Sequence, residues 1–274
     1  MVKAVIDEAY PRSLQMGFVR QGEPLLSHVF YTACEYAVQR GLWTVVQSNL
    51  SHDRPRLADE ICDSGLHNLV VSCDGATQEG YAAYRRSGNL ELVLDNVRRV
   101  VELKRRRGTR FPWVTMKFLI FDHNWHEIEA FETLARATGA DEVVFFTAFS
   151  SESDESGRAA DDHEFDLETL SWKRRAFGSC NFVWDELQLD YDGAVLPCCW
   201  AHTDEHLFVS PEDAQRMSLM ERWNSPAYRA TRSYFMGEGK RADLHSMCRS
   251  CELVEQHEQR TRVGAGEEVE RSRS

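Results

Sequence analysis

Four of the cysteines in the last 95 residues of the sequence have the residue type and spacing of a metal centre. Cys248 and Cys251 are two residues apart, a separation that lets both thiolates face one centre, and Cys180 and Cys198 precede them. Four thiolates bind either a tetrahedral zinc ion or an iron–sulfur cluster. The spacing alone does not separate zinc from iron–sulfur. We expect these four residues to be metal ligands.

The segment between the first two of these cysteines predicts how they are brought together. Residues 184–199, "WDELQLDYDGAVLPCC", alternate around Asp192-Gly193, which is typical of a β-hairpin. The returning strand would carry Cys198 toward Cys180. Neighbouring side chains of an extended chain point to opposite sides, so Cys199 is expected to be a spare thiol packed inward.

The other histidines and cysteines that could bind a metal give a less specific signal. His202 and His206 follow the cysteine pair and could replace a thiolate, although surface positions are expected. Cys34 and Cys62 fall in helical patterns beside apolar residues, which predicts buried core thiols, and Cys73 ends an apolar run.

A second kind of chemistry is suggested by "QGEP", residues 21–24, which follows the apolar run "SLQMGFV". Gly22 permits a close backbone approach, Pro24 suits a first helical turn, and Glu23 between them offers a carboxylate. One interpretation is a helix start with an acid near the positive end of its dipole. The other is a carboxylate that binds an ammonium group.

The elements that must position these residues follow a repeated pattern. Apolar runs of strand length are separated by segments with helical periodicity, which predicts βα units and a parallel sheet. The expected strands are 13–19, 42–48, 67–73, 113–121 and 141–149. Spacing alone does not distinguish an open or closed barrel from a doubly wound sheet. In both, ligands bind at the carboxyl ends of the strands.

Polar segments follow four of these strands. They are "QGEP", "SNLS" (48–51), "SCDGAT" (72–77) and "FDHN" (121–124). Each alone could be an ordinary turn, but the carboxyl ends of parallel strands share one edge. Together they predict a binding mouth.

Composition limits the class of protein. The chain has 274 residues, with 32 basic and 44 acidic side chains and a formal net charge of −12. This balance argues against a nucleic-acid or membrane partner, and no apolar run is long enough to span a bilayer. We expect a cytoplasmic protein with a βα domain at 1–150, an acidic linker at 151–166, a cysteine-rich domain at 167–262 and a disordered tail at 263–274.

The series "QGEPLL", "SNL", "VSCDGATQEGYAAYRRSGN" and "DGAVLPCCW…CRSC" resembles the radical S-adenosylmethionine (SAM) enzymes that carry a SPASM- or twitch-type auxiliary domain. The resemblance implies a partial open (β/α)6 barrel like a TIM barrel, followed by a small cysteine-rich domain. It implies that the Gly22–Glu23 segment binds the amino group of SAM. The resemblance also implies that the ribose and carboxylate of SAM are contacted by Ser48, Asn49, Ser72 and Asp74. Arg86 is a further candidate for these contacts.

The resemblance also implies cofactors and partners. Cys180, Cys198, Cys248 and Cys251 would hold one auxiliary 4Fe-4S cluster, which accepts an electron from a substrate radical or orients the substrate. The parent enzyme would be an oxidoreductase or maturase that uses SAM to start radical oxidation or maturation of a small molecule or a peptide. Flavodoxin or ferredoxin would be its electron donor.

One family feature does not occur in these residues. The catalytic cluster of the family is held by a Cys-x3-Cys-x2-Cys loop, and no such triplet is present. We therefore expect the sequence to begin after the first strand and its cluster loop, so a second 4Fe-4S cluster requires a missing N-terminus. This chain is not expected to cleave SAM alone. The alternatives are a non-catalytic iron–sulfur or electron-transfer module, and a four-cysteine zinc protein.

Overall fold

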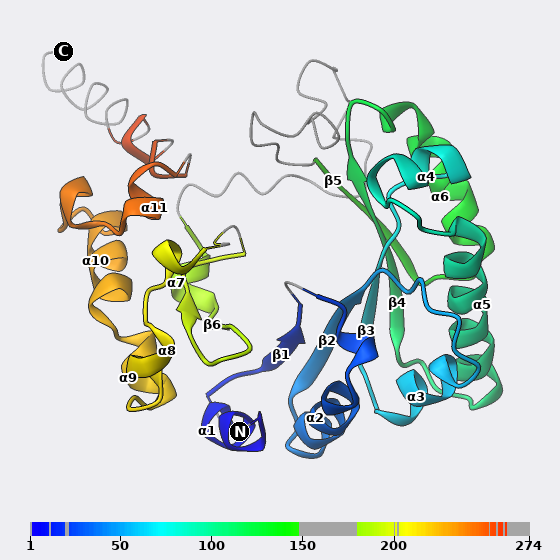
Figure 1. The fold of residues 1–274 in the computed structure, drawn as a ribbon, viewed down its shortest axis with the longest axis horizontal. Helices are drawn as coiled ribbons and strands as arrows, with labels where there is room; N and C mark the ends of the chain where they lie inside the picture. The colour runs from blue at the N-terminus through cyan, green and yellow to red at the C-terminus, as the bar shows by residue number, and fades with distance from the viewer. Residues whose placement is uncertain are drawn as a thin grey trace, which may run out of the picture. The chain divides into compact units, whose positions relative to one another are not determined.

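The computed structural model describes residues 2–147 and 180–261, apart from 11, 20, 21, 200, 202, 252, 256 and 260. The chain divides into two compact units, Met1–Arg174 and Arg175–Ser274 (Figure 1). The expected acidic linker and C-terminal tail lie outside the described residues, so the domain boundaries drawn from the sequence stay predictions.

The first unit is built on a five-stranded parallel sheet. Its strands are β1 (Gln15–Phe18), β2 (Trp43–Ser48), β3 (Asn68–Ser72), β4 (Trp113–Ile120) and β5 (Glu142–Thr147). All five strands expected from the sequence are confirmed. Their order is β1-β2-β3-β4-β5. Among these strands the order never reverses, which is the arrangement of a barrel-type sheet, whereas a doubly wound sheet reverses at its switch point.

The helices of this unit lie between or before the strands. They are α1 (Val2–Ala9), the 3-10 helix η1 (Pro24–Leu26), α2 (His28–Gln39), α3 (Leu57–Asp63), α4 (Gln78–Tyr84), α5 (Leu90–Arg106), the 3-10 helix η2 (Trp125–Glu127) and α6 (Ile128–Ala137). The long α5 begins where Asn89 caps it by accepting the Leu92 N–H at 3.1 Å. No helix in the described ranges is both long and apolar enough to cross a membrane.

The main core fills the space between the sheet and helices α2, α3, α5 and α6. Alternate residues of β4 are buried, and Phe118 packs against Phe131 of α6 and Phe145 of β5, with ring centroids 4.7 and 5.8 Å apart. Figure 1 shows α5 and α6 alongside the strands that they cover. This burial leaves the carboxyl ends of the strands as the edge where polar loops can gather.

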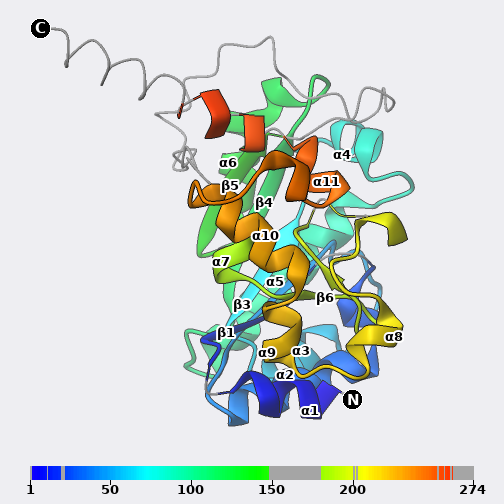
Figure 2. The same cartoon turned by 90° about the vertical axis from the view of Figure 1, so that its left-hand side faces the viewer.

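The second unit is made of short elements. They are α7 (Phe182–Asp185), β6 (Gln188–Leu189), β7 (Val195–Leu196), the 3-10 helix η4 (Asp204–His206), α8 (Pro211–Ala214), α9 (Leu219–Trp223), α10 (Pro226–Phe235), the 3-10 helix η5 (Arg241–Asp243) and α11 (Ser246–Arg249). Figure 2 shows α10, the longest of these helices, following α9. Strands β6 and β7 form the expected antiparallel hairpin, and Gly193 in its turn has φ +92°.

The edge of the sheet at the amino ends of the strands contains a histidine whose charge state affects stability. The Nδ1 atom of His67 accepts a hydrogen bond from the Thr44 N–H at 3.2 Å, and its ring stacks on Trp43 with centroids 4.6 Å apart. An Nδ1 that accepts cannot carry a proton, so the folded state holds the neutral ring. Burial lowers the pKa of His67.

We predict that His67 lowers the free energy of unfolding as the pH falls. Because its folded-state pKa lies below the unfolded value of about 6.5, the unfolded chain binds the proton first as pH falls, and stability is lost from about pH 7 downward. In the variant His67→Asn, the drop in Tm between about pH 7.5 and 5.5 should be smaller than in the wild type. The exposed His126 provides the control variant His126→Asn, which should keep the wild-type drop. An unchanged drop in His67→Asn would contradict the prediction.

Candidate functional site

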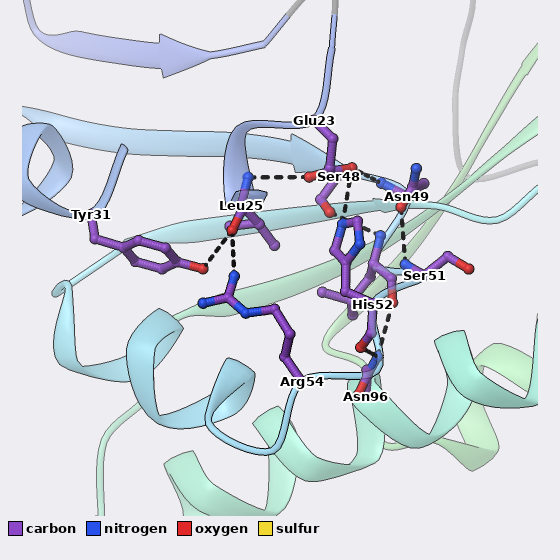
Figure 3. Close-up of polar contacts among 10 residues, drawn as sticks. Glu23, Leu25, Tyr31, Ser48, Asn49, Ser51, His52, Arg54 and Asn96 are labelled. Carbon is purple, nitrogen blue, oxygen red and sulfur yellow. Dashed lines mark hydrogen bonds and ion pairs between the residues drawn. The ribbon is translucent and has the colours of Figure 1, made fainter. Parts of the chain in front are cut away.

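The Glu23 carboxylate links the loops that follow β1 and β2. Gly22 has φ +83°, and Glu23 then caps η1, with its Oε1 accepting the Leu25 N–H at 3.2 Å. Its Oε2 accepts the Asn49 N–H at 2.9 Å (Figure 3). Both interpretations of "QGEP" are therefore compatible with the geometry, because the carboxylate caps a helix and also lies at the carboxyl edge of the sheet.

His52, which was not singled out from the sequence, lies next to this carboxylate. Its Nε2 is 3.7 Å from Glu23 Oε2, and the two side chains are only 12% and 11% exposed. This Nε2 is buried and has no hydrogen-bond partner. Nothing in the local sequence pattern indicates the contact, because the two residues are separated by 29 positions.

The loop after β2 is stabilised by its own side chains and by α5. Ser48 Oγ accepts the Leu50 N–H at 2.8 Å, and Asn49 Oδ1 accepts the Ser51 N–H at 2.9 Å. Asn96, a buried residue of α5, donates to the carbonyl oxygens of Leu50 and His52 at 3.0 and 2.9 Å (Figure 3). The structure thus brings Ser48 and Asn49 to the expected edge, where their side chains shape the loop. The Asn49 backbone N–H is the group that contacts Glu23.

A second carboxylate, Asp74, lies beyond the end of β3 and is fully buried. Its Oδ2 pairs with the Arg85 guanidinium at 2.8 Å, and its Oδ1 accepts the Leu119 N–H at 2.8 Å. Burial raises the pKa of Asp74, and the Arg85 charge opposes that rise. Arg85 was missed from the sequence, which drew attention to Arg86, an exposed residue. Ser72 Oγ accepts from Gln47 Nε2 at 2.9 Å and so links β3 to β2.

The loops after β3 and β4 are joined by two further buried side chains. Asn124 donates to the carbonyl oxygens of Asp74 and Leu119, both at 2.9 Å. Glu127 accepts from the Ala76 N–H at 2.7 Å, next to the start of α4. The four polar strand ends expected from the sequence therefore lie at one edge of the sheet. Hydrogen bonds join the end of β1 to that of β2 and the end of β3 to that of β4, and the bond from Gln47 to Ser72 links β2 to β3.

Four of the five cysteines of the second unit, those expected to be metal ligands, affect one another's pKa. Burial, and to a smaller extent the neighbouring Cys198, Cys180 and Cys251, raise the pKa of Cys248 to about 12. Burial likewise raises the pKa of Cys180, with Cys251 contributing. Cys180 and Cys248 pack against one small core, and Cys248 and Cys251 pack against a second. As placed, no three His, Cys, Asp or Glu side chains of the described residues form a single-ion site. What these residues offer is a soft, four-thiol donor set, which fits an iron–sulfur cluster or zinc.

The expectation for Cys199 is wrong. Its side chain is exposed rather than packed inward. The chain bends after β7, with the Ala201 N–H bonded to the Cys198 carbonyl at 3.2 Å, so the alternation of an extended strand does not continue to this residue. Cys34 and Cys73 are fully buried core thiols, and Cys62 is partly buried. His206 is partly buried, while His202 lies outside the described residues.

Residues 180–252 match the model of the SPASM family, an iron–sulfur cluster-binding domain. Curated protein sequences gave no match.

Solved structures provide matches to most of the chain. Streptococcus suis SuiB bound to S-adenosylmethionine matches with a TM-score of 0.63 and 12% identity, over 92% of this chain and 63% of SuiB. Native anSMEcpe with bound AdoMet matches with a TM-score of 0.59 and 14% identity, over 92% of this chain and 76% of that one. SuiB bound to the precursor peptide SuiA matches with a TM-score of 0.58 and 11% identity, over 84% of this chain and 59% of SuiB.

The chain thus spans about three fifths of the length of SuiB, and at these identities the match shows the fold. Residues 180–252 thus match the SPASM family of iron–sulfur cluster-binding domains, and the chain has the fold of SuiB and anSMEcpe.

Proposed function

We propose that this chain is a radical SAM/SPASM-type iron–sulfur protein that binds SAM at the carboxyl edge of its sheet. The observation that carries the proposal is the Glu23 carboxylate, which two backbone N–H groups hold at the ends of β1 and β2. It has no Lys or Arg ion-pair partner in the part of the chain that the structure describes. A fixed anion of this kind suits the ammonium group of SAM.

The roles of the other expected SAM residues are part of the same proposal. Gly22 gives the backbone turn that presents Glu23. Ser48 and Asn49 support the loop opposite to it, and Ser72 and Asp74 form the neighbouring edge. Asp74 has both oxygens engaged, so its contribution to SAM binding would be made through the backbone of its loop and through Arg85.

The second cofactor of the proposal is one auxiliary 4Fe-4S cluster on Cys180, Cys198, Cys248 and Cys251. When bound, such a cluster supplies a one-electron acceptor, or a site that orients substrate. The chain's own contribution is four partly buried thiols, two of which, Cys180 and Cys198, lie near the buried Tyr228. Cleavage of SAM also needs the three thiolates of a Cys-x3-Cys-x2-Cys loop, a pattern that these 274 residues do not contain.

A peptide is the favoured substrate class of the complete enzyme. SuiB was solved with its precursor peptide SuiA, and anSMEcpe with the Kp18Cys peptide. The reaction would then be a radical oxidation or maturation of a peptide side chain. A small-molecule substrate is the other option. Flavodoxin or ferredoxin as electron donor and a cytoplasmic location belong to the same proposal.

We predict that Glu23→Gln weakens SAM binding about tenfold or more, because hydrogen bonds to a charged group contribute more than those to a neutral one. Isothermal titration of the full chain with SAM measures the change. Glu35→Gln alters an exposed carboxylate on α2 and should leave the affinity unchanged. Equal affinities of Glu23→Gln and wild type would contradict this role for Glu23.

We also predict that the chain purified without oxygen contains about four irons and matching sulfide. Cys180→Ala and Cys248→Ala should lose both, measured by iron and acid-labile sulfide analysis. Cys199→Ala changes the exposed thiol next to Cys198 and should retain them. One zinc ion in place of iron would support the zinc alternative instead.

A further inference from the structure

His52 combines three features that neither the fold nor the sequence pattern explains. Its Nε2 is buried, has no hydrogen-bond partner and faces the Glu23 carboxylate. A buried polar atom without a partner is unfavourable unless something else satisfies it. The distance of 3.7 Å to Glu23 Oε2 is too long for a direct hydrogen bond.

The position of His52 is fixed by the surrounding structure. Asn96 of α5 bonds the carbonyl oxygens of both His52 and Leu50, and Leu50 is held at φ +50°. Because Asn96 is itself buried in the helix, the loop has little freedom to close the gap between the imidazole and the carboxylate. The separation of the two groups is therefore part of the architecture of the loop.

The Glu23 carboxylate has acceptor capacity left that a cation could use. Its two oxygens accept from the Leu25 and Asn49 backbone N–H groups, which use only part of the acceptor capacity of a carboxylate. Arg54 bonds the Leu25 carbonyl of the same loop at 2.7 Å, but its charge is paired with Glu60. Figure 3 shows His52 on one side of the carboxylate and Arg54 directed at the Leu25 carbonyl.

We propose that His52 Nε2 is a second acceptor for the ammonium group that Glu23 binds. An ammonium has three donors and forms hydrogen bonds of about 2.8 Å, so one nitrogen can reach both Glu23 Oε2 and His52 Nε2. The imidazole is neutral in this arrangement, with its hydrogen on Nδ1. The inference rests on the proposed SAM site and adds to it a residue that recognises the aminoacyl part of the ligand.

The opposite arrangement makes a different prediction. A protonated His52 would pair with Glu23 itself and repel an ammonium. Removing the imidazole would then strengthen the binding of SAM. The sign of the change therefore separates a recognition residue from a competing cation.

The test uses the full chain and three ligands, namely SAM, S-adenosylhomocysteine and 5′-methylthioadenosine. The first two carry the ammonium, and the third has the same nucleoside without the aminoacyl chain. Equilibrium dialysis measures their affinities for wild type, His52→Ala, His52→Gln and the exposed control His126→Gln. Thermal unfolding of each variant reports whether the fold is kept.

We expect His52→Ala to weaken SAM and S-adenosylhomocysteine about tenfold or more and to leave 5′-methylthioadenosine unchanged. His52→Gln, whose side-chain carbonyl is an acceptor, should recover part of the loss. The inference is overturned if all three ligands weaken equally, if none changes, or if SAM binds more tightly. A wild-type chain that binds none of the three ligands would overturn the proposed SAM site itself, whereas wild-type binding without a His52 effect would overturn only this inference.

Discussion

The buried carboxylate of Asp74 is the constraint on which the edge of the sheet depends. A fully buried charge is costly unless a cation and hydrogen-bond donors surround it. Arg85 and the Leu119 N–H meet this requirement, and the Asn124 amide bonds the Asp74 carbonyl. Because these groups come from the end of α4, from β4 and from the loop after β4, satisfying the charge holds these three segments together.

Glu23 lies at the same edge of the sheet, but within the described residues it is not paired with a guanidinium as Asp74 is. Asp74 is paired with a guanidinium, whereas the neighbours of the Glu23 oxygens are backbone N–H groups and the His52 ring. The first carboxylate is paired with a cation and holds structure, and the second keeps acceptor capacity at a fixed position. This difference explains why two acids that look alike in the sequence have different capacities to bind a ligand.

The parts of this structure that the sequence predicted are those encoded over short distances. Apolar periodicity located all five strands, and Asp192-Gly193 located the hairpin. The contacts made by Asn96, His52 and Glu127 join positions that are 29 to 51 residues apart, so no local pattern contains them. Cys199 was misjudged because the bend that exposes it follows directly after a strand of two residues.

Three of the cysteines of the second unit also pack against its two small apolar cores. One small core surrounds Val183, Val195 and Tyr228, and a second contains Tyr234, Leu244 and Val254. Cys180 packs against the first core, Cys251 against the second, and Cys248 against both. A metal group bound by all four thiolates would join these cores, neither of which buries much apolar surface alone. Metal binding and folding of this unit would then be coupled, because the ligands come together only in the folded chain.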